Sequence, residues 1–315
     1  MLVFSFMKLS HKAKSATRGT NLNMDRPMTV PAISFEFFPP QNLEASFRLW
    51  DTVQVLAPMA PRFVSVTYGA GGTTRDLTRD AVATIHKHSG LNVAAHLTCV
   101  NATRAETLAI ADQFAEAGVT DIVALRGDPP KGTGAFQPHA DGFASSVALI
   151  ESLAETGKFN IRVGAYPEKH PEAASSAADV NYLKRKFDAG ADEALTQFFF
   201  EAETFFRFRD ACEKAGIDKP IIPGIMPIAN WKGARNFARR CGATVPAWMD
   251  EAFDKAARDG REDLLATALA TELCSELIDG GVDSLHFYTL NRPELTRDVC
   301  HALGVTPKTT LENVA

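Results

Sequence analysis

A single carboxylate stands among bulky apolar residues near the start of the chain. Glu36 lies in the segment SFEFFPP (34–40), where three phenylalanines and two prolines are its neighbours. Poor solvation of a carboxyl group disfavours its charged form and raises its pKa. We therefore predict that the pKa of Glu36 is raised toward neutrality, as a general acid requires. The alternative is a structural glutamate that forms a salt bridge at the end of a strand.

A second candidate group follows an apolar run in LRGD (125–128), where Arg126 and Asp128 flank Gly127. The glycine lets a ligand approach the backbone closely. The alternative is a surface turn that holds an ion pair. His96, in AHLTC (95–99), is in the same way either a site residue or a hydrogen-bonded core histidine.

Three adjacent cations occupy positions 184–186 on a segment with helical apolar spacing. Such a run is typical of a solvated helix face. The other interpretation is a clamp for a diphosphate, because Lys and Arg are the usual partners of phosphate. The residues alone leave both interpretations open.

Several common cofactor motifs are absent from the sequence. The segment GAGGTT (69–74) is rich in glycine but matches neither a Walker loop nor a G-x-G-x-x-G fingerprint, so a Rossmann cofactor domain is not indicated. The five cysteines are dispersed and odd in number, which argues against a disulfide framework or a zinc site. The histidines have no metal-ligand spacing, and we expect no metal.

Short apolar runs rich in β-branched residues alternate with longer helical segments from residue 31 onward. Most runs begin about 30 residues after the previous one, the length of a strand plus a crossover helix. Several runs are apolar at successive positions, as parallel strands buried on both faces are. The predicted strands are 32–37, 62–67, 92–97, 121–125, 161–165, 194–199, 221–225 and 284–288.

One turn pattern recurs where a helix is expected to lead into a strand. EAGVTD (116–121), DAGADE (188–193), KAGIDK (214–219) and DGGVDS (279–284) each place a glycine at the end of a helix, where it takes a positive φ. The eight predicted strands and the helical segments between them make eight β/α units, which predict an α/β protein with a single (β/α)8 TIM barrel. In this fold the chemistry gathers at the carboxyl ends of the strands, where polar residues follow most of the predicted runs. The last crossover has room for extra helices around 231–240 and 247–257.

The chain has 315 residues and a formal net charge of −5, from 33 basic and 38 acidic residues. This balance argues against nucleic acid as a partner, since such binders usually carry a basic surplus. No apolar run approaches the roughly 20 residues that span a bilayer, and the N-terminal segment has its basic residues after its apolar ones, the reverse of a signal peptide. We expect a cytoplasmic protein with a flexible N-terminal extension (1–30), a barrel (31–305) and a C-terminal tail (306–315).

A series of motifs follows along the chain: SFEFFPP, FVSVTYGAGG, AAHLTC, IVALRGDPP, AYPEKHPEA, LKRKFDAGADEALTQFFF, IIPGIMPI, PAWM and HFYTLNR. In this order they resemble the motifs of bacterial methylenetetrahydrofolate reductases, from about Ile33 to Gly304. The resemblance implies an FAD-containing β/α barrel that reduces 5,10-methylenetetrahydrofolate to 5-methyltetrahydrofolate with NADH or NADPH. The product supplies methyl groups for methionine synthesis and one-carbon metabolism.

The resemblance also implies a role for each matching residue. Glu36 corresponds to the general acid, which protonates N10 of the folate so that the five-membered ring opens to an iminium. Asp128 corresponds to an aspartate beside the flavin that also holds the pterin, and its charge favours hydride transfer to the iminium. Gln197, Phe237 and Arg292 correspond to positions that meet folate or nicotinamide. The positions that match flavin contacts are Thr67, Tyr68, Ala70, His96, Arg126, Gly127, Asp128, Ala144, Tyr166, His170, Ala173, Asp179, Arg185 and Lys186.

The implied cycle is ping-pong, with NADH favoured over NADPH because of the bacterial-type length, and the implied assembly is a homo-oligomer. Two positions depart from the family pattern: Tyr182 stands where an asparagine that contacts FAD is expected, and Gly233 stands where a glutamine that contacts substrate is expected.

Two other functions remain as alternatives. A flavin-free barrel lyase or aldolase would be colourless when purified, whereas a flavin-dependent reductase would be yellow. An inactive barrel that binds another subunit is disfavoured by the presence of both Glu36 and Asp128.

Overall fold

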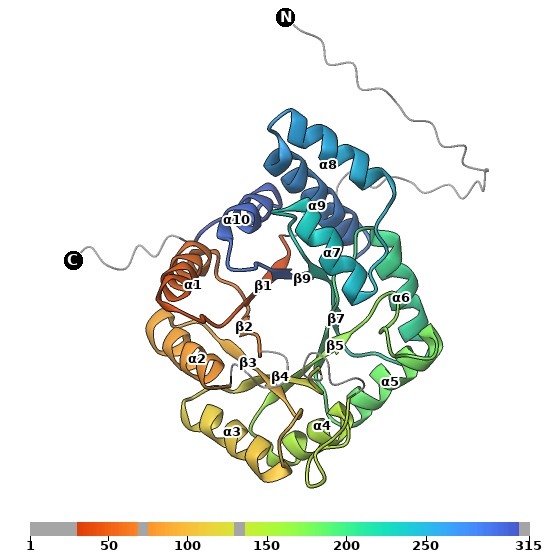
Figure 1. Cartoon of the computed structure of the whole chain (residues 1–315). Helices are drawn as coiled ribbons and strands as arrows, with labels where there is room; N and C mark the ends of the chain where they lie inside the picture. Colours follow the sequence, from red (N-terminus) through yellow and green to blue (C-terminus); the bar gives the residue numbers. More distant parts are fainter. Residues whose placement is uncertain (1–29, 69–74, 129–135, 309–315) are drawn as a thin grey trace, which may run out of the picture.

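The computed structural model describes residues 30–68, 75–128 and 136–308 of the chain. Strands and helices alternate in these ranges, and the helices form a ring around the strands (Figure 1). The strands are β1 (Ala32–Phe37), β2 (Val64–Val66), β3 (Val93–Thr98), β4 (Asp121–Leu125), β5 (Asn160–Ala165), β6 (Glu193–Thr196), β7 (Ile221–Ile222), β8 (Gly224–Ile225) and β9 (Ser284–Tyr288). The helices are α1 (Leu43–Leu56), the 3₁₀ helix η1 (Ala57–Met59), α2 (Arg75–Ser89), α3 (Arg104–Glu116), α4 (Ser146–Thr156), α5 (Ser176–Asp188), α6 (Ala202–Lys214), α7 (Trp231–Cys241), α8 (Trp248–Arg258), α9 (Glu262–Asp279) and α10 (Pro293–Ala302).

The strands form one parallel sheet in the order β7-β6-β5-β4-β3-β2-β1-β9-β8. Its two ends, β7 and β8, are separated in the chain only by Pro223, so the sheet closes on itself as a barrel. The structure thus confirms the predicted (β/α)8 TIM-barrel class. Each predicted strand is present, with ends that differ by a few residues at most.

The seventh predicted strand, 221–225, is divided into two. Ile221–Ile222 pairs with β6, and Gly224–Ile225 pairs with β9. Pro223 lies between them and has no N–H to donate to a neighbouring strand, so the ladder is interrupted at this residue. A Cβ atom on Gly224 would lie 2.1 Å from the carbonyl oxygen of Thr196, so only glycine fits there without a shift of the backbone. Nine strand segments therefore fill eight barrel positions.

The predicted local signals at helix ends are confirmed. Thr103 and Glu106 form a capping box at the start of α3, with the backbone N–H of each residue donating to the side chain of the other. In each of the four recurring turns one glycine has a positive φ, as the helix-to-strand turn requires. They are Gly118 (81°), Gly190 (113°), Gly216 (76°) and Gly281 (89°).

A buried charged group fills the barrel interior near the amino-terminal ends of β4 and β6. The guanidinium of Arg162 forms ion pairs with Asp121 and Glu193, and these three side chains are between 2% and 8% exposed. Arg62 also donates to Glu193, at 3.1 Å. The Arg162 guanidinium lies 3.8 Å from the centroid of the Phe63 ring, so an aromatic face also packs on the buried cation. We call Asp121, Arg162 and Glu193 the basal charge group.

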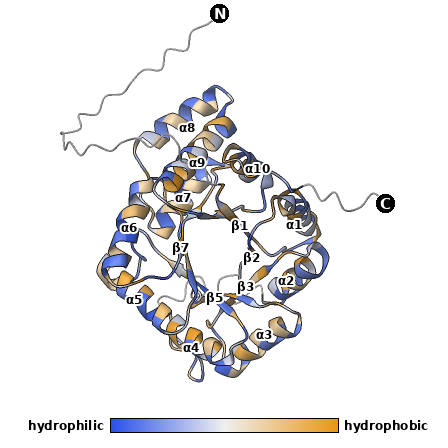
Figure 2. Cartoon of the chain, turned by 180° about the vertical axis from the view of Figure 1, so that it is seen from behind, coloured by the Kyte–Doolittle hydropathy of each residue, from blue (hydrophilic) through white to orange (hydrophobic). Residues whose placement is uncertain are grey.

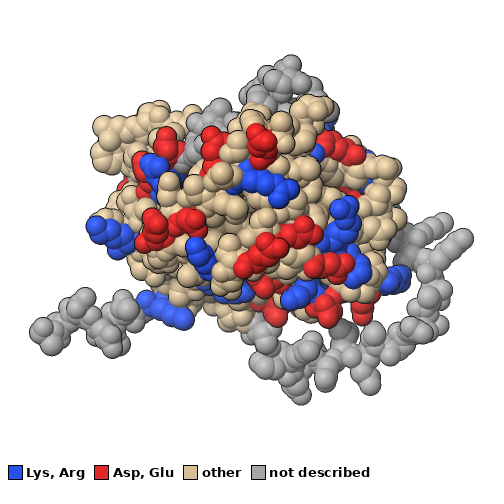
Figure 3. Space-filling model, turned by 90° about the horizontal axis from the view of Figure 1, so that it is seen from below, with Lys and Arg blue, Asp and Glu red and all other residues tan. Residues whose placement is uncertain are grey.

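The long crossover after β8 contains α7 and α8, as the sequence predicted, and α8 lies outside the ring of helices (Figure 1). Hydrophilic and hydrophobic residues both occur along the outer helices, as expected where one face packs on the strands (Figure 2). The face in Figure 3 carries acidic and basic side chains interspersed. No helix in the described ranges is long and apolar enough to cross a membrane. The predicted N-terminal extension lies, except for Val30, outside the described residues.

Candidate active site

Two adjoining cavities open at the carboxyl ends of the strands. The central cavity, of about 200 Å³, lies over the barrel and is lined by Glu36 and His96 among others. The lateral cavity, of about 490 Å³, extends from the ends of β4 and β5 to α4 and α5. The two cavities share Leu125, Gly164 and Tyr166 as lining residues. A ligand in the lateral cavity and a ligand in the central cavity would therefore meet at this common wall.

Glu36 lies on β1 between two histidines of other strands. Its Oε2 atom is 3.2 Å from Nε2 of His96 on β3 and 3.8 Å from Nε2 of His286 on β9. The Oγ atom of Ser65 also lies 3.5 Å from Oε2. His286 is completely buried, and its Nδ1 atom is hydrogen-bonded to the hydroxyl of Ser34 at 2.8 Å. The carboxyl group therefore contacts imidazoles on both sides, at one wall of the central cavity.

The predicted direction of the Glu36 pKa shift was wrong. Burial of the carboxyl group by itself acts to raise its pKa, as the sequence suggested. Hydrogen bonding and positive charge from His286 and His96 outweigh this effect and lower the pKa of Glu36 from 4.5 to about 2. Burial also lowers the pKa of His286, against the opposing effect of the Glu36 charge. In the chain without ligands, Glu36 is therefore ionised at neutral pH.

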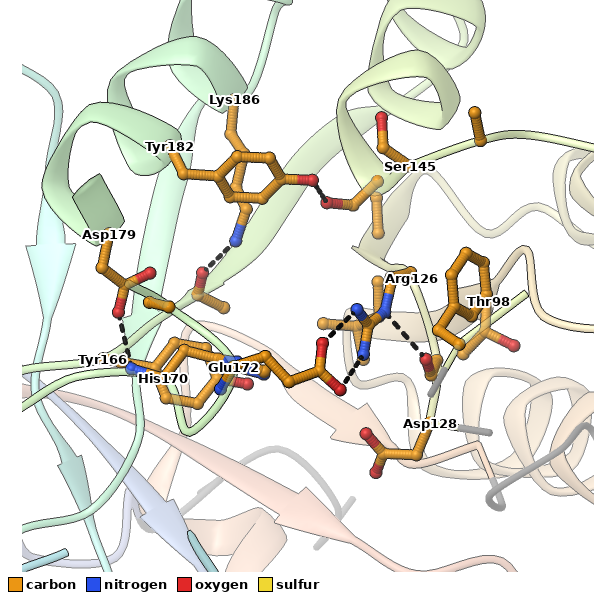
Figure 4. A pocket seen from close by; sticks show the side chains of 18 of the residues that line it. Thr98, Arg126, Asp128, Ser145, Tyr166, His170, Glu172, Asp179, Tyr182 and Lys186 are labelled. Carbon is orange, nitrogen blue, oxygen red and sulfur yellow. Dashed lines mark hydrogen bonds and ion pairs between the residues drawn. The ribbon is translucent and has the colours of Figure 1, made fainter. Parts of the chain in front are cut away.

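Most of the predicted flavin-contact residues come together around the lateral cavity (Figure 4). A Cβ on Gly127 would meet the side chains of Val100 and Thr98 at 2.7 and 3.0 Å, and its φ is 86°, so packing and backbone both require glycine there. The predicted residues that line the cavity are Tyr68, Arg126, Gly127, Asp128, Ala144, Tyr166, His170, Ala173, Asp179 and Lys186.

Arg126 links the end of β4 to the loop between β5 and α5. Its guanidinium donates to both carboxylate oxygens of Glu172, at 2.6 and 3.2 Å (Figure 4). This pairing raises the pKa of Arg126 and lowers the pKa of Glu172. The Phe136 ring packs on the guanidinium, with its centroid 4.7 Å from Cζ. In the same loop the backbone N–H of His170 donates to Asp179 at 2.7 Å, which ties the loop to α5.

The three adjacent cations of α5 occupy different environments. Lys184 pairs with Asp188 at the surface, at 3.2 Å. Arg185 is exposed and does not line the lateral cavity. Lys186 is buried, lines the cavity and donates from Nζ to the carbonyl of Gly164 at 2.7 Å. Burial lowers the pKa of Lys186 to about 8. Only Lys186 of the three therefore faces the cavity.

Of the three residues predicted to meet folate or nicotinamide, two line the central cavity and one lines neither cavity. Gln197 and Phe237 line the central cavity, and the Phe237 ring stacks on Phe198 with 5.4 Å between the centroids. Arg292 is exposed at the N-cap of α10 and lines neither cavity.

Other predicted positions also lie apart from the lateral cavity. Thr67 directly follows β2 and lines neither cavity. Its carbonyl accepts a hydrogen bond from the Thr78 hydroxyl at 2.9 Å. His96 lines the central cavity instead of the lateral one. Ala70 lies outside the described residues.

Several residues of the site were not among the predicted site residues. His286 could have been found from strand alternation, because it shares a face with Tyr288 at the carboxyl end of β9. Thr98 and Glu172 line the lateral cavity, but no spacing in the sequence marks them. Tyr182, which was noted only as a departure from the family pattern, lines the same cavity. In the described ranges no group of three or more His, Cys, Asp or Glu side chains is arranged to hold a metal ion.

Comparison with known proteins identifies the family. Residues 23–304 match the family description Methylenetetrahydrofolate reductase. The chain belongs to the methylenetetrahydrofolate reductase family. A 5,10-methylenetetrahydrofolate reductase of Salmonella typhimurium is 46% identical over 276 residues, which are 87% of this chain and 91% of that protein. Methylenetetrahydrofolate reductase (NADH) 1 of Arabidopsis thaliana is 34% identical over 312 residues, 95% of this chain and 51% of that protein.

The fold of the methylenetetrahydrofolate reductase chain is also found in a solved structure of low sequence identity. An uncharacterized protein from Clostridium thermocellum that binds two copies of 5-methyl-5,6,7,8-tetrahydrofolic acid superposes with a TM-score of 0.56 at 14% identity. The match covers 88% of this chain and 95% of the other. This likeness supports the barrel architecture.

Proposed function

We propose that this methylenetetrahydrofolate reductase uses FAD, held in the lateral cavity, and takes its reducing equivalents from NADH in preference to NADPH. The observation that carries the proposal is the common wall of the two cavities, formed by Leu125, Gly164 and Tyr166. A flavin ring at this wall would face a folate or nicotinamide in the central cavity, where Glu36 lies.

The residues of the lateral cavity fit a flavin dinucleotide. Its volume of about 490 Å³ is in the range of cofactor sites. Thr98 lines the cavity, and its buried hydroxyl has no hydrogen-bond partner among the described residues. Lys186 offers a cation to a diphosphate, and Ser145 and Ser146 place the N-terminus of α4, the positive end of its dipole, at the same cavity.

When bound, FAD would accept hydride from the nicotinamide and deliver it to the folate in a second half-reaction, which gives ping-pong kinetics. Asp128 lines the lateral cavity at the end of β4, where its negative charge would oppose the accumulation of negative charge on a reduced flavin and so favour hydride transfer to the folate. Gln197 and Phe237 would orient each substrate in turn against the common wall. Arg292, on the exposed loop after β9, would reach only a part of the folate that extends out of the cavity.

Glu36 would supply the proton that the folate half-reaction needs. Because Glu36 is ionised without ligands, the proton must first reach its Oε2 atom, and the nearest donors are Nε2 of His96 and Nε2 of His286. From Oε2 the proton would pass to N10 of the folate, which breaks the bond between N10 and the bridging carbon. The resulting iminium at N5 is the acceptor of hydride, and the product is 5-methyltetrahydrofolate.

The product would supply methyl groups for methionine synthesis. We also propose that the chain acts in the cytoplasm, because its five cysteines are all free, as in proteins of a reducing compartment. A homo-oligomeric assembly is part of the same proposal and rests on the family resemblance.

The visible spectrum of the purified protein tests the use of flavin. We expect flavin absorbance that is bleached by NADH without oxygen and restored by 5,10-methylenetetrahydrofolate. A colourless protein that takes up no FAD on incubation would contradict the proposal and would favour the flavin-free lyase or aldolase. Bleaching by NADPH at an equal rate would contradict only the preference for NADH.

A further inference from the structure

A third cavity, of about 510 Å³, lies among the outer helices, where α9 packs against α6 and α8 (Figure 1). None of its described lining residues belongs to the central or the lateral cavity. Its floor is apolar and includes Phe200, Met226, Met249, Ala266, Leu269 and Leu273. Trp248, at the start of α8, lines the cavity and is 49% exposed. We call this cavity the outer groove, and an apolar surface of this kind is suited to a binding partner.

The rim of the outer groove is acidic. Its exposed charged residues are Glu201, Glu203, Glu272, Glu276 and Arg207. Arg207 forms an ion pair with Glu203, at 3.8 Å. Within the described ranges the other three glutamates take part in no ion pair. An occupant that fits the groove is therefore both apolar and basic.

The chain itself contains a segment of this composition. Residues 1–22 precede the part that matches the family, which begins at residue 23. They start with the apolar run MLVFSFM (1–7), which contains Phe4 and Phe6, and four cations follow at positions 8, 12, 14 and 18. This segment contains no Asp or Glu. Its charge is opposite to that of the groove rim, and the two attract each other over about 10 Å at 0.1 M salt.

The start of β1 lies next to the end of the helix that lines the groove. The backbone N–H of Ala32 donates to the carbonyl of Asp283, at 2.8 Å, and Asp283 follows the last residue of α9 by four positions. Between Ala266 and Glu276 the helix lines the groove over about 15 Å, at a rise of 1.5 Å per residue. Residues 23–29 alone span about 23 Å when extended. The segment 1–22 is therefore tethered close enough to lie along α9.

We propose that residues 1–22 of this chain dock in the outer groove, with their apolar side chains on its floor and their cations along its acidic rim. The order of the two parts fits this placement. The cations are nearer to β1 in the sequence, and Glu272 and Glu276 lie on the half of α9 that is nearer to β1. The apolar residues come first in the chain and would reach Ala266 and Leu269 on the other half. This inference is independent of the flavin and of the reaction.

Photocrosslinking in the full-length chain tests the inference. Phe4 is replaced by the photoreactive analogue p-benzoylphenylalanine, which on illumination forms a bond to a C–H group that it contacts. We expect the main crosslink to join position 4 to the groove floor of the same chain, at Met249, Leu269 or their neighbours, as mapped by mass spectrometry. A mixture of unlabelled and heavy-isotope-labelled protein separates crosslinks within one chain from crosslinks between two chains.

Paired charge reversals distinguish docking from chance proximity. Glu272→Lys combined with Glu276→Lys should slow the initial rate of crosslinking to the groove by at least about twofold, since each surface ion pair contributes about 0.2–1 kcal/mol. Glu151→Lys combined with Glu155→Lys is the matched control, because these exposed glutamates have the same spacing on α4. The control should leave the rate unchanged.

Three results would overturn the inference. Crosslinks that form mainly between two chains would assign the groove to a second copy of the protein. Crosslinks spread evenly over the surface would show that the segment has no docking site. Equal rates in the two charge-reversal variants would show that the acidic rim does not attract the segment.

Discussion

The Nε2 atom of His96 lies 3.2 Å from Oε2 of Glu36, although their strands, β3 and β1, are separated by β2. Barrel curvature brings inward side chains of such strands together across the interior. Glu36, which has mainly phenylalanines as neighbours in sequence, thereby gains His96 as a polar partner from another strand.

Glu36→Gln should leave FAD binding and flavin reduction by NADH intact while the folate half-reaction slows by about 10²–10⁴-fold. The reason is that only the folate needs a proton, and glutamine cannot transfer one. Anaerobic stopped-flow measurements separate the two half-reactions. An equal slowing of both would show that Glu36 positions a shared part of the site.

Lys186→Ala and Arg185→Ala should differ, although the residues are adjacent. Lys186 lines the cavity, and loss of a charge-assisted hydrogen bond costs about 1.5–3 kcal/mol, so FAD affinity should fall by about 10- to 150-fold. Arg185→Ala should change the affinity by less than about threefold, because the side chain is exposed. Both variants should keep a wild-type circular dichroism spectrum. Comparable losses of FAD affinity in both variants would support the interpretation that Arg185 and Lys186 together bind the diphosphate.

FAD binding should weaken as the pH rises from 7 to 9. Burial lowers the pKa of Lys186 to about 8, so without flavin its ammonium is about nine-tenths protonated at pH 7 and about one-tenth at pH 9. A diphosphate pairs with the protonated form, and its affinity is therefore present below the pKa and lost above it. In Lys186→Arg the guanidinium stays charged, so the dependence should flatten. A wild-type pH profile in this variant would assign the titration to another group.

Phe237→Ala should slow both half-reactions and leave FAD binding unchanged. The ring lines the central cavity, which each substrate would occupy in turn, and aromatic pairing contributes about 0.5–1.5 kcal/mol. Phe237→Tyr, which keeps the ring, is the control. Phe237 also stacks on Phe198, so a purely structural role predicts a lower melting temperature with normal binding constants for both substrates. That result would remove Phe237 from the site.

Much of the barrel could be predicted because its signals are local. The strands that begin at Ala32, Asp121 and Ser284 have the predicted bounds, and the turn glycines have the expected positive φ. The break at Pro223 was not predicted, because the run of apolar residues around it has a normal strand length. Its effect becomes clear only when β6 and β9 are known to flank it.

The site was less predictable, since its electrostatics depend on residues far apart in the chain. The register of β1 and β9 pairs His286 with Ser34, so His286 lies on the same face as Glu36 with its Nε2 3.8 Å from Oε2, whereas the residues around Glu36 in sequence suggested only burial. On α5, a rotation of about 100° per residue separates exposed Arg185 from buried Lys186. The family resemblance assigned both to one role, whereas helix geometry gives each a different environment.

Arg162→Met should destabilise the fold by about 3–5 kcal/mol, because it leaves the buried carboxylates of Asp121 and Glu193 without their shared cation. Urea denaturation at pH 7 measures the loss. Adding Asp121→Asn and Glu193→Gln to the same chain should recover part of it. A single variant as stable as wild type would show that water or Arg62 compensates the charges.

The basal charge group also constrains how this sequence can diverge. Arg162, Asp121 and Glu193 lie on three consecutive strands, and a change at one position leaves a buried charge uncompensated at another. Homologues that lack the arginine should therefore lack both acids or carry a cation at one of their positions. The three sites are expected to vary together across the family, independently of the active-site residues above them.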